Sequence, residues 1–378
     1  MRHIYLFTLV IIAFISLPAF SQTTDSFMVG GVYRNYIIHL PAGYNASHAY
    51  PLVLNLHGYT SNATQEEIYT QMDASADANG YIVVYPNGIA NYWNSWGPPG
   101  ATYGADDVQF LSTLIDTISA DYHVNPKRIY SCGISNGGYM TYTLACNIAN
   151  RLAAVASVSG TLSNYTLANC NLQRKIPVLH IHGTADPIVY YATGAANSIG
   201  AEQTVAFWRD TDACANISDT LDLPNTDIAD SSTVQLISYQ NCPSTNEILF
   251  YKITNGGHTW PGGLVDIASY GNTNRDISAT DVIWAFFDRY TLDGQVTGVN
   301  EISTDPAITI SPNPTSDRLH INTSLDIVHT DIYDLTGRKV MSANASKVID
   351  IESLSCGIYT VAISYGPGSR TSAKFVKE

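Results

Sequence analysis

The chain has 378 residues, enough for one large domain and one small one. Its 18 Lys and Arg against 32 Asp and Glu leave a formal net charge of −14, which argues against nucleic acid or an anionic membrane surface as a partner. Charged residues make up only 13% and hydrophobic residues 45%, so the chain is too apolar to be disordered and can bury a sizeable core.

The first 21 residues have the pattern of an export signal. Residues 1–3 form a short, positively charged segment, and residues 4–17 form an almost unbroken apolar run without a charge. Ala19 and Ser21 then supply the small residues that a cleavage site requires. Because the run is short for a bilayer span, we expect residues 1–21 to be a cleaved signal peptide. The mature chain, with no membrane span, would be secreted or held at the cell surface.

Six cysteines follow the predicted signal. Export places them in an oxidising compartment, where disulfides form. Cys146 and Cys170 bracket one polar segment, and Cys214 and Cys242 bracket another. We therefore expect the disulfides Cys146–Cys170 and Cys214–Cys242, with Cys132 a buried free thiol in an apolar strand.

The first large region alternates short apolar runs with helical patterns. A hairpin is predicted at residues 27–40, turned at Gly30-Gly31. Helices are predicted around residues 108–118, 139–148 and 282–290, the last capped by Ser278 or Thr280. The predicted strands are 51–56, 81–85, 128–132, 153–158, 178–182 and 248–253. This alternation indicates a mostly parallel sheet with helices on both faces, so residues 22–294 are predicted to form one α/β domain.

The character of the chain changes after this domain. Residues 295–304 are polar and read as a linker. Residues 305–378 contain short β-rich runs with no convincing helix between them, which predicts a small all-β sandwich. The predicted strands there are 307–310, 318–321, 327–333, 347–351 and 358–365.

A glycine-rich turn around Ser135 is the strongest chemical signal. Gly133-Ile134-Ser135-Asn136-Gly137 follows a predicted strand and precedes a predicted helix. Such a turn raises the serine hydroxyl to the edge of the sheet, above the start of the helix. We therefore predict Ser135 as a nucleophile, with the backbone N–H of Asn136 stabilising the oxyanion of a tetrahedral intermediate.

A serine nucleophile needs a base and a group that orients the base. In α/β-hydrolases these follow in the chain order acid, then histidine. Asp186 comes just past the predicted strand 178–182, and His258 lies in a glycine-rich loop after the last predicted strand. We predict His258 as the base and Asp186 as its orienting acid.

The second oxyanion donor is expected after an early strand, in Leu56-His57-Gly58-Tyr59. The N–H of Tyr59 is the predicted donor, with Thr60 or a shifted loop as the alternative. No metal is expected, because the chain has no CxxC motif and no Cys/His cluster. His180 and His182 are expected to point to opposite faces of their strand, which argues against a shared metal.

The region from Leu56 to Gly262 resembles the secreted esterases of the polyhydroxybutyrate-depolymerase and feruloyl-esterase group, including carbohydrate esterase family 1. The motifs that carry the resemblance are Leu56-His57-Gly58, Trp93-Asn94, Asp106-Asp107-Val108, Gly133 to Tyr139, His182 to Asp186 and Gly257 to Gly262. The resemblance implies an α/β-hydrolase fold and a serine esterase without metal or cofactor, using Ser135, Asp186 and His258. It also implies that Trp260 lies beside the acyl pocket. Trp93 and His57 are expected near the substrate, and Trp96 is expected either there or in the core.

The β-rich tail resembles the C-terminal sorting domain of type IX secretion substrates. Its motifs are Ile310 to Pro314, Ile332 to Arg338, Leu354 to Val361 and the basic end Lys374 to Lys377, with Cys356 standing where a proline or small residue is usual. The resemblance implies a partner in the type IX secretion machinery and an address function for the tail.

These observations lead to one main hypothesis and several alternatives. The leading one is a secreted serine esterase that hydrolyses carboxylic esters of plant cell-wall polysaccharide, of the feruloyl or acetyl xylan esterase type. Depolymerisation of polyhydroxybutyrate or another polyhydroxyalkanoate is the alternative, although no added surface-binding module is evident. The ordered set of Ser135, Asp186 and His258 argues against a non-catalytic carbohydrate-binding or adhesion protein, and a peptidase is the weakest option.

Overall fold

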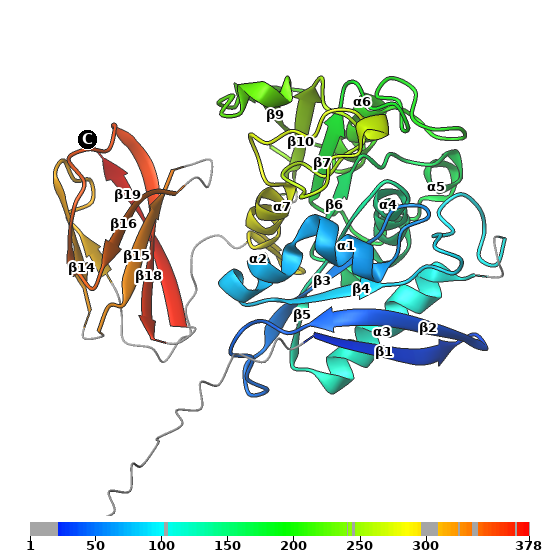
Figure 1. The fold of residues 1–378 in the computed structure, drawn as a ribbon, viewed down its shortest axis with the longest axis horizontal. Helices are drawn as coiled ribbons and strands as arrows, with labels where there is room; N and C mark the ends of the chain where they lie inside the picture. The colour runs from blue at the N-terminus through cyan, green and yellow to red at the C-terminus, as the bar shows by residue number, and fades with distance from the viewer. Residues whose placement is uncertain are drawn as a thin grey trace, which may run out of the picture.

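The computed structural model describes residues 22–101, 105–239, 241–243, 246–295, 309–323, 326–334, 339–366 and 369–377. Within these residues, the larger part of the chain folds around one ten-stranded sheet (Figure 1). Its strands lie in the order β1-β2-β4-β3-β5-β6-β7-β10-β9-β8. In chain order they are β1 (Gln22–Val29), β2 (Val32–His39), β3 (Tyr50–Leu56), β4 (Ile82–Pro86), β5 (Val124–Ile134), β6 (Ala154–Val158), β7 (Val178–Gly183), β8 (Ser218–Asp222), β9 (Thr233–Tyr239) and β10 (Ile248–Thr254).

The centre of the sheet is parallel, and both margins are antiparallel. The six strands from β4 through β10 in sheet order run parallel, whereas β1, β2, β9 and β8 pair in the antiparallel sense. The predicted opening hairpin is confirmed, because Val29 pairs with Val32 across Gly30 and Gly31, whose φ angles are +58° and +81°. A two-residue turn with positive φ at both positions matches the twist of the flanking strands.

Helices cover both faces of the sheet, as the sequence predicts (Figure 1). One core contains the apolar side chains of α3 (Asp107–Asp121), α4 (Asn136–Ile148) and α6 (Ala201–Thr211), with α5 (Asn164–Asn169) at its margin. The opposite core contains those of α1 (Ala63–Thr70), α2 (Met72–Asn79) and α7 (Ala279–Phe287). Successive residues of β3 divide between the two cores: Leu52, Leu54 and Leu56 face the first, and Val53 faces the second.

Several elements differ from the sequence-based expectation. The helix α7 has one of its two predicted caps, Ser278, whose side chain accepts a hydrogen bond from the N–H of Asp281 at 3.2 Å, but it ends at Phe287 and not at residue 290. Tyr290 instead begins β11 (Tyr290–Thr291), which pairs with β12 (Gly294–Gln295). Three short 3-10 helices, η1 (Ala149–Arg151), η2 (Ile228–Asp230) and η3 (Ala268–Tyr270), lie in connections.

The structure joins Cys146 to Cys170 and Cys214 to Cys242. The first bond ties the last turn of α4 to the residue that follows α5, and the second ties the end of the α6 region to the segment after β9. Such links stabilise the folded state mainly by restricting the conformations of the unfolded chain. Cys132 is a buried free thiol and Cys356 an exposed one.

The C-terminal strands form two antiparallel sheets that share one core (orange to red in Figure 1). One sheet is β13 (Thr309–Ser311), β14 (Arg318–Asn322) and β17 (Val348–Asp350); the other is β16 (Lys339–Asn344), β15 (His329–Tyr333), β18 (Gly357–Gly366) and β19 (Ser369–Lys377). Leu319 and Ile349 from the first sheet and Ile332, Val361 and Phe375 from the second are buried together. This arrangement is the predicted sandwich.

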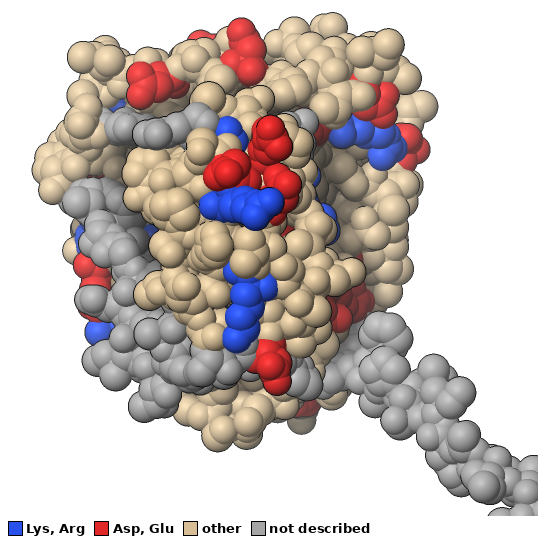
Figure 2. Space-filling view, turned by 90° about the vertical axis from the view of Figure 1, so that its left-hand side faces the viewer, with Lys and Arg blue, Asp and Glu red and all other residues tan. Residues whose placement is uncertain are grey.

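The predicted signal peptide, residues 1–21, and most of the predicted linker, residues 296–304, lie outside the described residues. In the part of the chain that is described, no helix is both long and apolar enough to cross a membrane. Figure 2 shows that most of the face drawn there is neither acidic nor basic, in line with the low fraction of charged residues.

Candidate active site

Ser135 occupies a strained turn between a strand and a helix. Strand β5 ends at Ile134 and α4 begins at Asn136, so Ser135 is the only residue between them. Its φ and ψ angles are +55° and −120°, a region that side-chain-bearing residues rarely adopt. The N–H of Ser135 donates to the carbonyl oxygen of Val158 at 2.9 Å, and its own carbonyl accepts from the N–H of Tyr139 at 3.0 Å. These bonds hold the turn in place on both sides.

The flanking glycines explain why this sequence can form the turn. A Cβ atom built on Gly133 would lie 2.4 Å from the carbonyl oxygen of Leu56, and one built on Gly137 would lie 1.9 Å from the same atom. Neither position has room for a side chain. The glycines therefore allow β3, β5 and α4 to approach closely enough to present Ser135 at the edge of the sheet.

The three candidate catalytic residues follow three parallel strands at one edge of the sheet. Ser135 follows β5, Asp186 follows β7 and His258 follows β10, and these strands lie in the order β5-β6-β7-β10. The ends of β7 and β10 are close together, because a Cβ on Gly183 would lie 2.2 Å from the carbonyl oxygen of Gly256. The fold thus brings the three loops to the place where open α/β sheets bind ligands.

Asp186 and His258 are in direct contact. Nδ1 of His258 donates a hydrogen bond to Oδ2 of Asp186 at 2.8 Å, and both side chains are buried. The other carboxylate oxygen, Oδ1, accepts the N–H groups of Ile188 at 2.9 Å and Val189 at 2.8 Å. Burial alone would raise the pKa of Asp186, but His258, His182 and the Ile188 N–H together lower it below the usual value. The ionised carboxylate is therefore suited to fix the His258 ring with Nε2 free to accept a proton.

His182, on β7, supports this pair from inside the domain. Its Nε2 donates to the carbonyl oxygen of Val189 at 2.8 Å and lies 3.5 Å from Oδ2 of Asp186. Burial lowers the pKa of His182, which keeps the ring neutral. The expectation that His180 and His182 point to opposite faces is wrong, since residues two apart in a strand share a face and their ring centroids are 5.3 Å apart. Among the described residues, no group of three or more His, Cys, Asp or Glu could hold a metal ion.

The predicted oxyanion donors belong to the loop after β3 and to the start of α4. A Cβ on Gly58 would be 3.5 Å from Cβ of Ser135, so the loop after β3 lies against the serine. The N–H of Thr60 donates to the carbonyl oxygen of Asn91 at 3.0 Å, which leaves Tyr59 as the better candidate of the two. Asn136 is the first residue of α4, where backbone N–H groups have no acceptor within the helix.

The side chain of Asn136 has a role that sequence reasoning missed. Its Oδ1 accepts the N–H of Trp93 at 2.7 Å, while its Nδ2 donates to the carbonyl of Trp93 at 3.0 Å and to Oγ of Ser95 at 3.2 Å. This pairing ties the loop after β4 to the start of α4. In the sequence, the only indication of this role is that an asparagine directly follows Ser135 in the glycine-rich turn.

Three of the predicted substrate contacts, Trp93, His57 and Trp260, are buried and make internal hydrogen bonds. Nε1 of Trp93 donates to the carbonyl of His57 at 3.0 Å, and Nε2 of His57 accepts the N–H of Gly88 at 3.0 Å. Burial lowers the pKa of His57 to about 4. Nε1 of Trp260 donates to Oγ1 of Thr280 at 3.1 Å. These hydrogen bonds hold the loops that contain the three side chains, and Trp260 also lines a cavity beside α2 and the start of α7.

Other aromatic side chains are accessible near the candidate site. Tyr59 is 60% exposed and Tyr190, in the loop after Asp186, is 58% exposed. Trp96 is half-buried and packs against Tyr139 with ring centroids 4.5 Å apart. The expectation that Trp96 lies near the substrate is thus compatible with its position one helical turn from Ser135.

The fold and the arrangement of the loops define an α/β-hydrolase, and comparisons with known proteins agree. Residues 34–200 match the family described as "Esterase PHB depolymerase", and residues 309–378 match the "Secretion system C-terminal sorting domain". An acetyl xylan esterase from Aspergillus awamori superposes with a TM-score of 0.52 at 14% identity, covering 70% of this chain and 99% of that one. This likeness concerns the fold.

Related sequences show the family. The putative esterase NocK of Nocardia uniformis subsp. tsuyamanensis is 31% identical over 285 residues, 69% of this chain and 81% of that protein. The bifunctional acetylxylan esterase/xylanase XynS20E of Neocallimastix patriciarum is 29% identical over 71% of this chain, and feruloyl esterase B of Piromyces equi is 28% identical over 60%. The chain spans 36% and 42% of the lengths of those two relatives. The chain belongs to this esterase family, and its C-terminal sorting domain supports export.

Proposed function

We propose that this protein is an exported serine esterase that hydrolyses carboxylic esters of plant cell-wall polysaccharide, releasing feruloyl or acetyl groups. The observation that carries the proposal is the 2.8 Å hydrogen bond between His258 and Asp186, at the sheet edge where Ser135 occupies its strained turn. Esters attached to a neutral polymer suit a chain with net charge −14, because such a substrate is not repelled.

In the proposed reaction, Oγ of Ser135 attacks the ester carbonyl carbon while Nε2 of His258 accepts the hydroxyl proton. The N–H groups of Tyr59 and Asn136 stabilise the negative oxygen of the tetrahedral intermediate. Collapse of the intermediate breaks the ester bond, and His258 gives its proton to the departing sugar oxygen. Water, activated by His258, then attacks the acyl-enzyme and releases the acid and Ser135. Asp186 stabilises the imidazolium form of His258 throughout.

The acyl class is supported by the relatives. Two of them are named for acetylxylan esterase and feruloyl esterase activity, and both match more than half of this chain. The exposed Tyr59 and Tyr190 offer aromatic surface in the loops after β3 and β7, which also hold the candidate oxyanion donor and Asp186.

A hydrolysis panel tests the proposal. The purified chain is compared with its Ser135→Ala variant on methyl ferulate, acetylated xylan and an amorphous polyhydroxybutyrate suspension. We expect release of ferulate or acetate by the parent chain and its loss in the variant. Clearing of the polyester with little release from the first two substrates would overturn the polysaccharide-ester proposal.

Polyester hydrolysis is the second candidate, and one observation favours it. The loop that follows His258 exposes Leu264, Val265 and Ile267, by 59%, 45% and 39%. An apolar loop beside the site could contact a polyester surface, and the matching family is described by its PHB depolymerase. In the panel, the variant Leu264→Ser/Val265→Ser/Ile267→Ser would then lose polyester clearing selectively.

We further propose that export uses a signal peptide at residues 1–21 and the type IX secretion machinery, with residues 305–378 as the address and residues 295–304 as a linker. The mature protein would then be secreted or held at the cell surface. A chain truncated after Thr291 should retain ester hydrolysis but remain unsecreted in a host with that machinery. A truncated chain that folds without activity would contradict these domain boundaries.

A further inference from the structure

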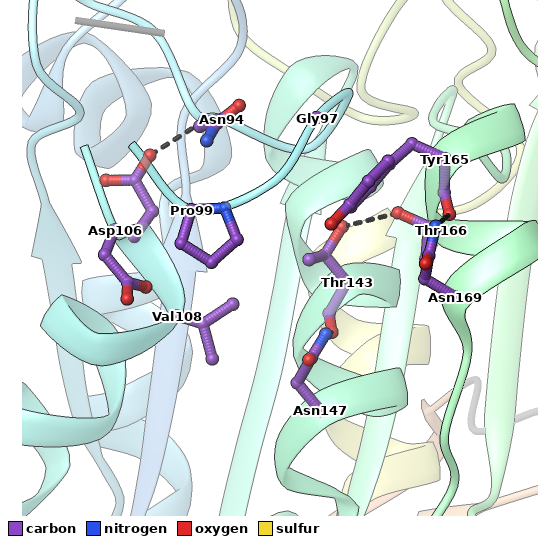
Figure 3. A pocket seen from close by; sticks show the side chains of 11 residues that line it. Asn94, Gly97, Pro99, Asp106, Val108, Thr143, Asn147, Tyr165, Thr166 and Asn169 are labelled. Atoms are coloured by element: carbon purple, nitrogen blue, oxygen red, sulfur yellow. Dashed lines mark hydrogen bonds between the residues drawn. The ribbon is translucent and has the colours of Figure 1, made fainter. Parts of the chain in front are cut away.

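A cavity lies along α4, away from Ser135 (Figure 3). Its enclosed volume is about 60 Å³, so it takes up only part of a small molecule, such as the edge of one ring, while the rest of the ligand lies in the open space in front of it. Figure 3 shows Pro99 and Val108 on one side and Tyr165, Thr143 and Asn147 on the other. The mechanism described above uses none of these residues.

The cavity and the candidate nucleophile lie along the same side of α4. Ser135, Tyr139, Thr143 and Asn147 are spaced by four residues, so they follow one stripe along α4. Thr143 and Asn147 are eight and twelve residues beyond Ser135, which at the helical rise places them roughly 12 and 18 Å away. Trp96 packs on Tyr139 between the two places. A few linked sugar residues could span this distance while passing over Trp96.

The lining is rich in hydrogen-bond acceptors. Oδ1 of Asp106 accepts the N–H of Gln109, and within the described residues Oδ2 makes no hydrogen bond. Asn147 and Asn169 each donate Nδ2 to a backbone carbonyl one turn earlier, at 2.7 and 2.8 Å, and so keep Oδ1 available. Within the described residues, the buried Oδ1 of Asn94 at the wall has no hydrogen-bond partner. Acceptors of this kind match the hydroxyl donors of a sugar.

The rest of the lining sets the charge and shape of the ligand. Asp106 adds negative charge, and the cavity lining contains no Lys or Arg, so an acidic ligand is disfavoured. Tyr165 is half-buried, with an apolar ring and a polar hydroxyl, and it faces Pro99 across the cavity (Figure 3). A flat, uncharged ring bearing several hydroxyl groups fits these features.

We propose that this cavity binds a neutral sugar residue of the same polysaccharide whose ester reaches Ser135. This inference rests on the proposed function, because it assigns the polymer that carries the ester a second contact a few sugar residues from the cleaved bond. Such a contact strengthens binding of a polymer but is out of reach for a small ester.

The first test measures binding without turnover. Ser135→Ala protein is titrated with xylohexaose by calorimetry, beside the same protein carrying Asn147→Ala and Tyr165→Ala. The matched control carries Asn150→Ala, an exposed asparagine outside the cavity. We expect the cavity variant to bind about tenfold more weakly, as the loss of one or two hydrogen bonds and a ring contact implies, and the control to match its parent. Equal affinity of all three proteins, or no binding by any, would overturn the proposal.

The second test separates this inference from the proposed function. With Ser135 intact, the ratio of kcat/KM on acetylated xylan to that on p-nitrophenyl acetate should fall about tenfold in the cavity variant and stay constant in the Asn150→Ala control. If the protein releases acetate from acetylated xylan and the ratio is unchanged, the proposed sugar contact at the cavity is refuted and the proposed function is not affected. Xylohexaose binding through the cavity by a protein that releases neither acetate from acetylated xylan nor ferulate from methyl ferulate would support the cavity and refute the function.

Discussion

Oδ2 of Asp186 lies between two histidines, 2.8 Å from Nδ1 of His258 and 3.5 Å from Nε2 of His182. One histidine lies in the loop after β10, and the other is buried in β7. The Asp186 carboxylate therefore contacts both the candidate base at the edge of the sheet and a histidine inside the sheet. This relationship gives the candidate base a fixed ring orientation, and it underlies the first two predictions.

Replacing Asp186 by Asn should lower kcat by about 10⁴-fold, because the amide cannot favour the His258 tautomer that leaves Nε2 unprotonated. The measurement is steady-state hydrolysis of p-nitrophenyl acetate. Asp219→Asn, an exposed carboxylate on β8, is the matched control and should leave kcat as it was. Comparable rates for the two variants would show that Asp186 does not orient the base.

Replacing His182 by Phe should lower both stability and activity, because it keeps an aromatic ring but removes both ring nitrogens. The change leaves the Val189 carbonyl without its donor, at a cost of about 1–3 kcal/mol in the free energy of unfolding. The loop that holds Asp186 then loosens, and we expect kcat to fall about tenfold, equivalent to about 1.4 kcal/mol in the barrier. Denaturant unfolding and kinetics on the same samples check both effects. A loss of stability with full activity would make His182 a structural residue only.

Glu66 should make stability depend on pH. This α1 side chain is buried, its Oε1 has no partner among the described residues, and burial raises its pKa well above the usual value. The folded state therefore holds a proton that the unfolded state releases, so stability falls as pH rises above the unfolded pKa of about 4.3. Glu66→Gln should remove this fall and be more stable than the parent at pH 8.

Thermal unfolding at several pH values between 4 and 8 checks the prediction for Glu66. The advantage of Glu66→Gln over the parent chain should shrink toward low pH, where the parent is protonated in both states. Glu352→Gln, an exposed position before β18, is the control and should give parallel curves. An advantage that stays constant with pH would mean that the carboxyl group is not the cause.

Much of the fold could be predicted because its central strands are short, apolar and separated by helical patterns. Two of the elements that escaped prediction lack that contrast. Strand β8 is exposed along its whole length at the margin of the sheet, and α1 buries Glu66 and Thr70 instead of an apolar stripe. Periodicity of apolar residues therefore gave no signal in either element.

The candidate site shows the same division. The turn at Ser135 is visible in the sequence, because the backbone leaves no space for a side chain at Gly133 or Gly137. The burial of Trp93 and Trp260 is not visible, since it depends on loops whose hydrogen bonds are made to distant residues such as Asn136 and Thr280. An aromatic residue next to a motif can support the site from below as well as line it.

The most direct measurement is kcat of Ser135→Ala on p-nitrophenyl acetate, with Ser26→Ala, an exposed serine on β1, as the control. Circular dichroism first establishes that both variants are folded. We predict that Ser135→Ala loses about 10⁴-fold or more of kcat, as removal of a serine nucleophile does, while Ser26→Ala keeps the parent rate. A loss of less than tenfold in folded Ser135→Ala would contradict the assignment of Ser135 as the nucleophile.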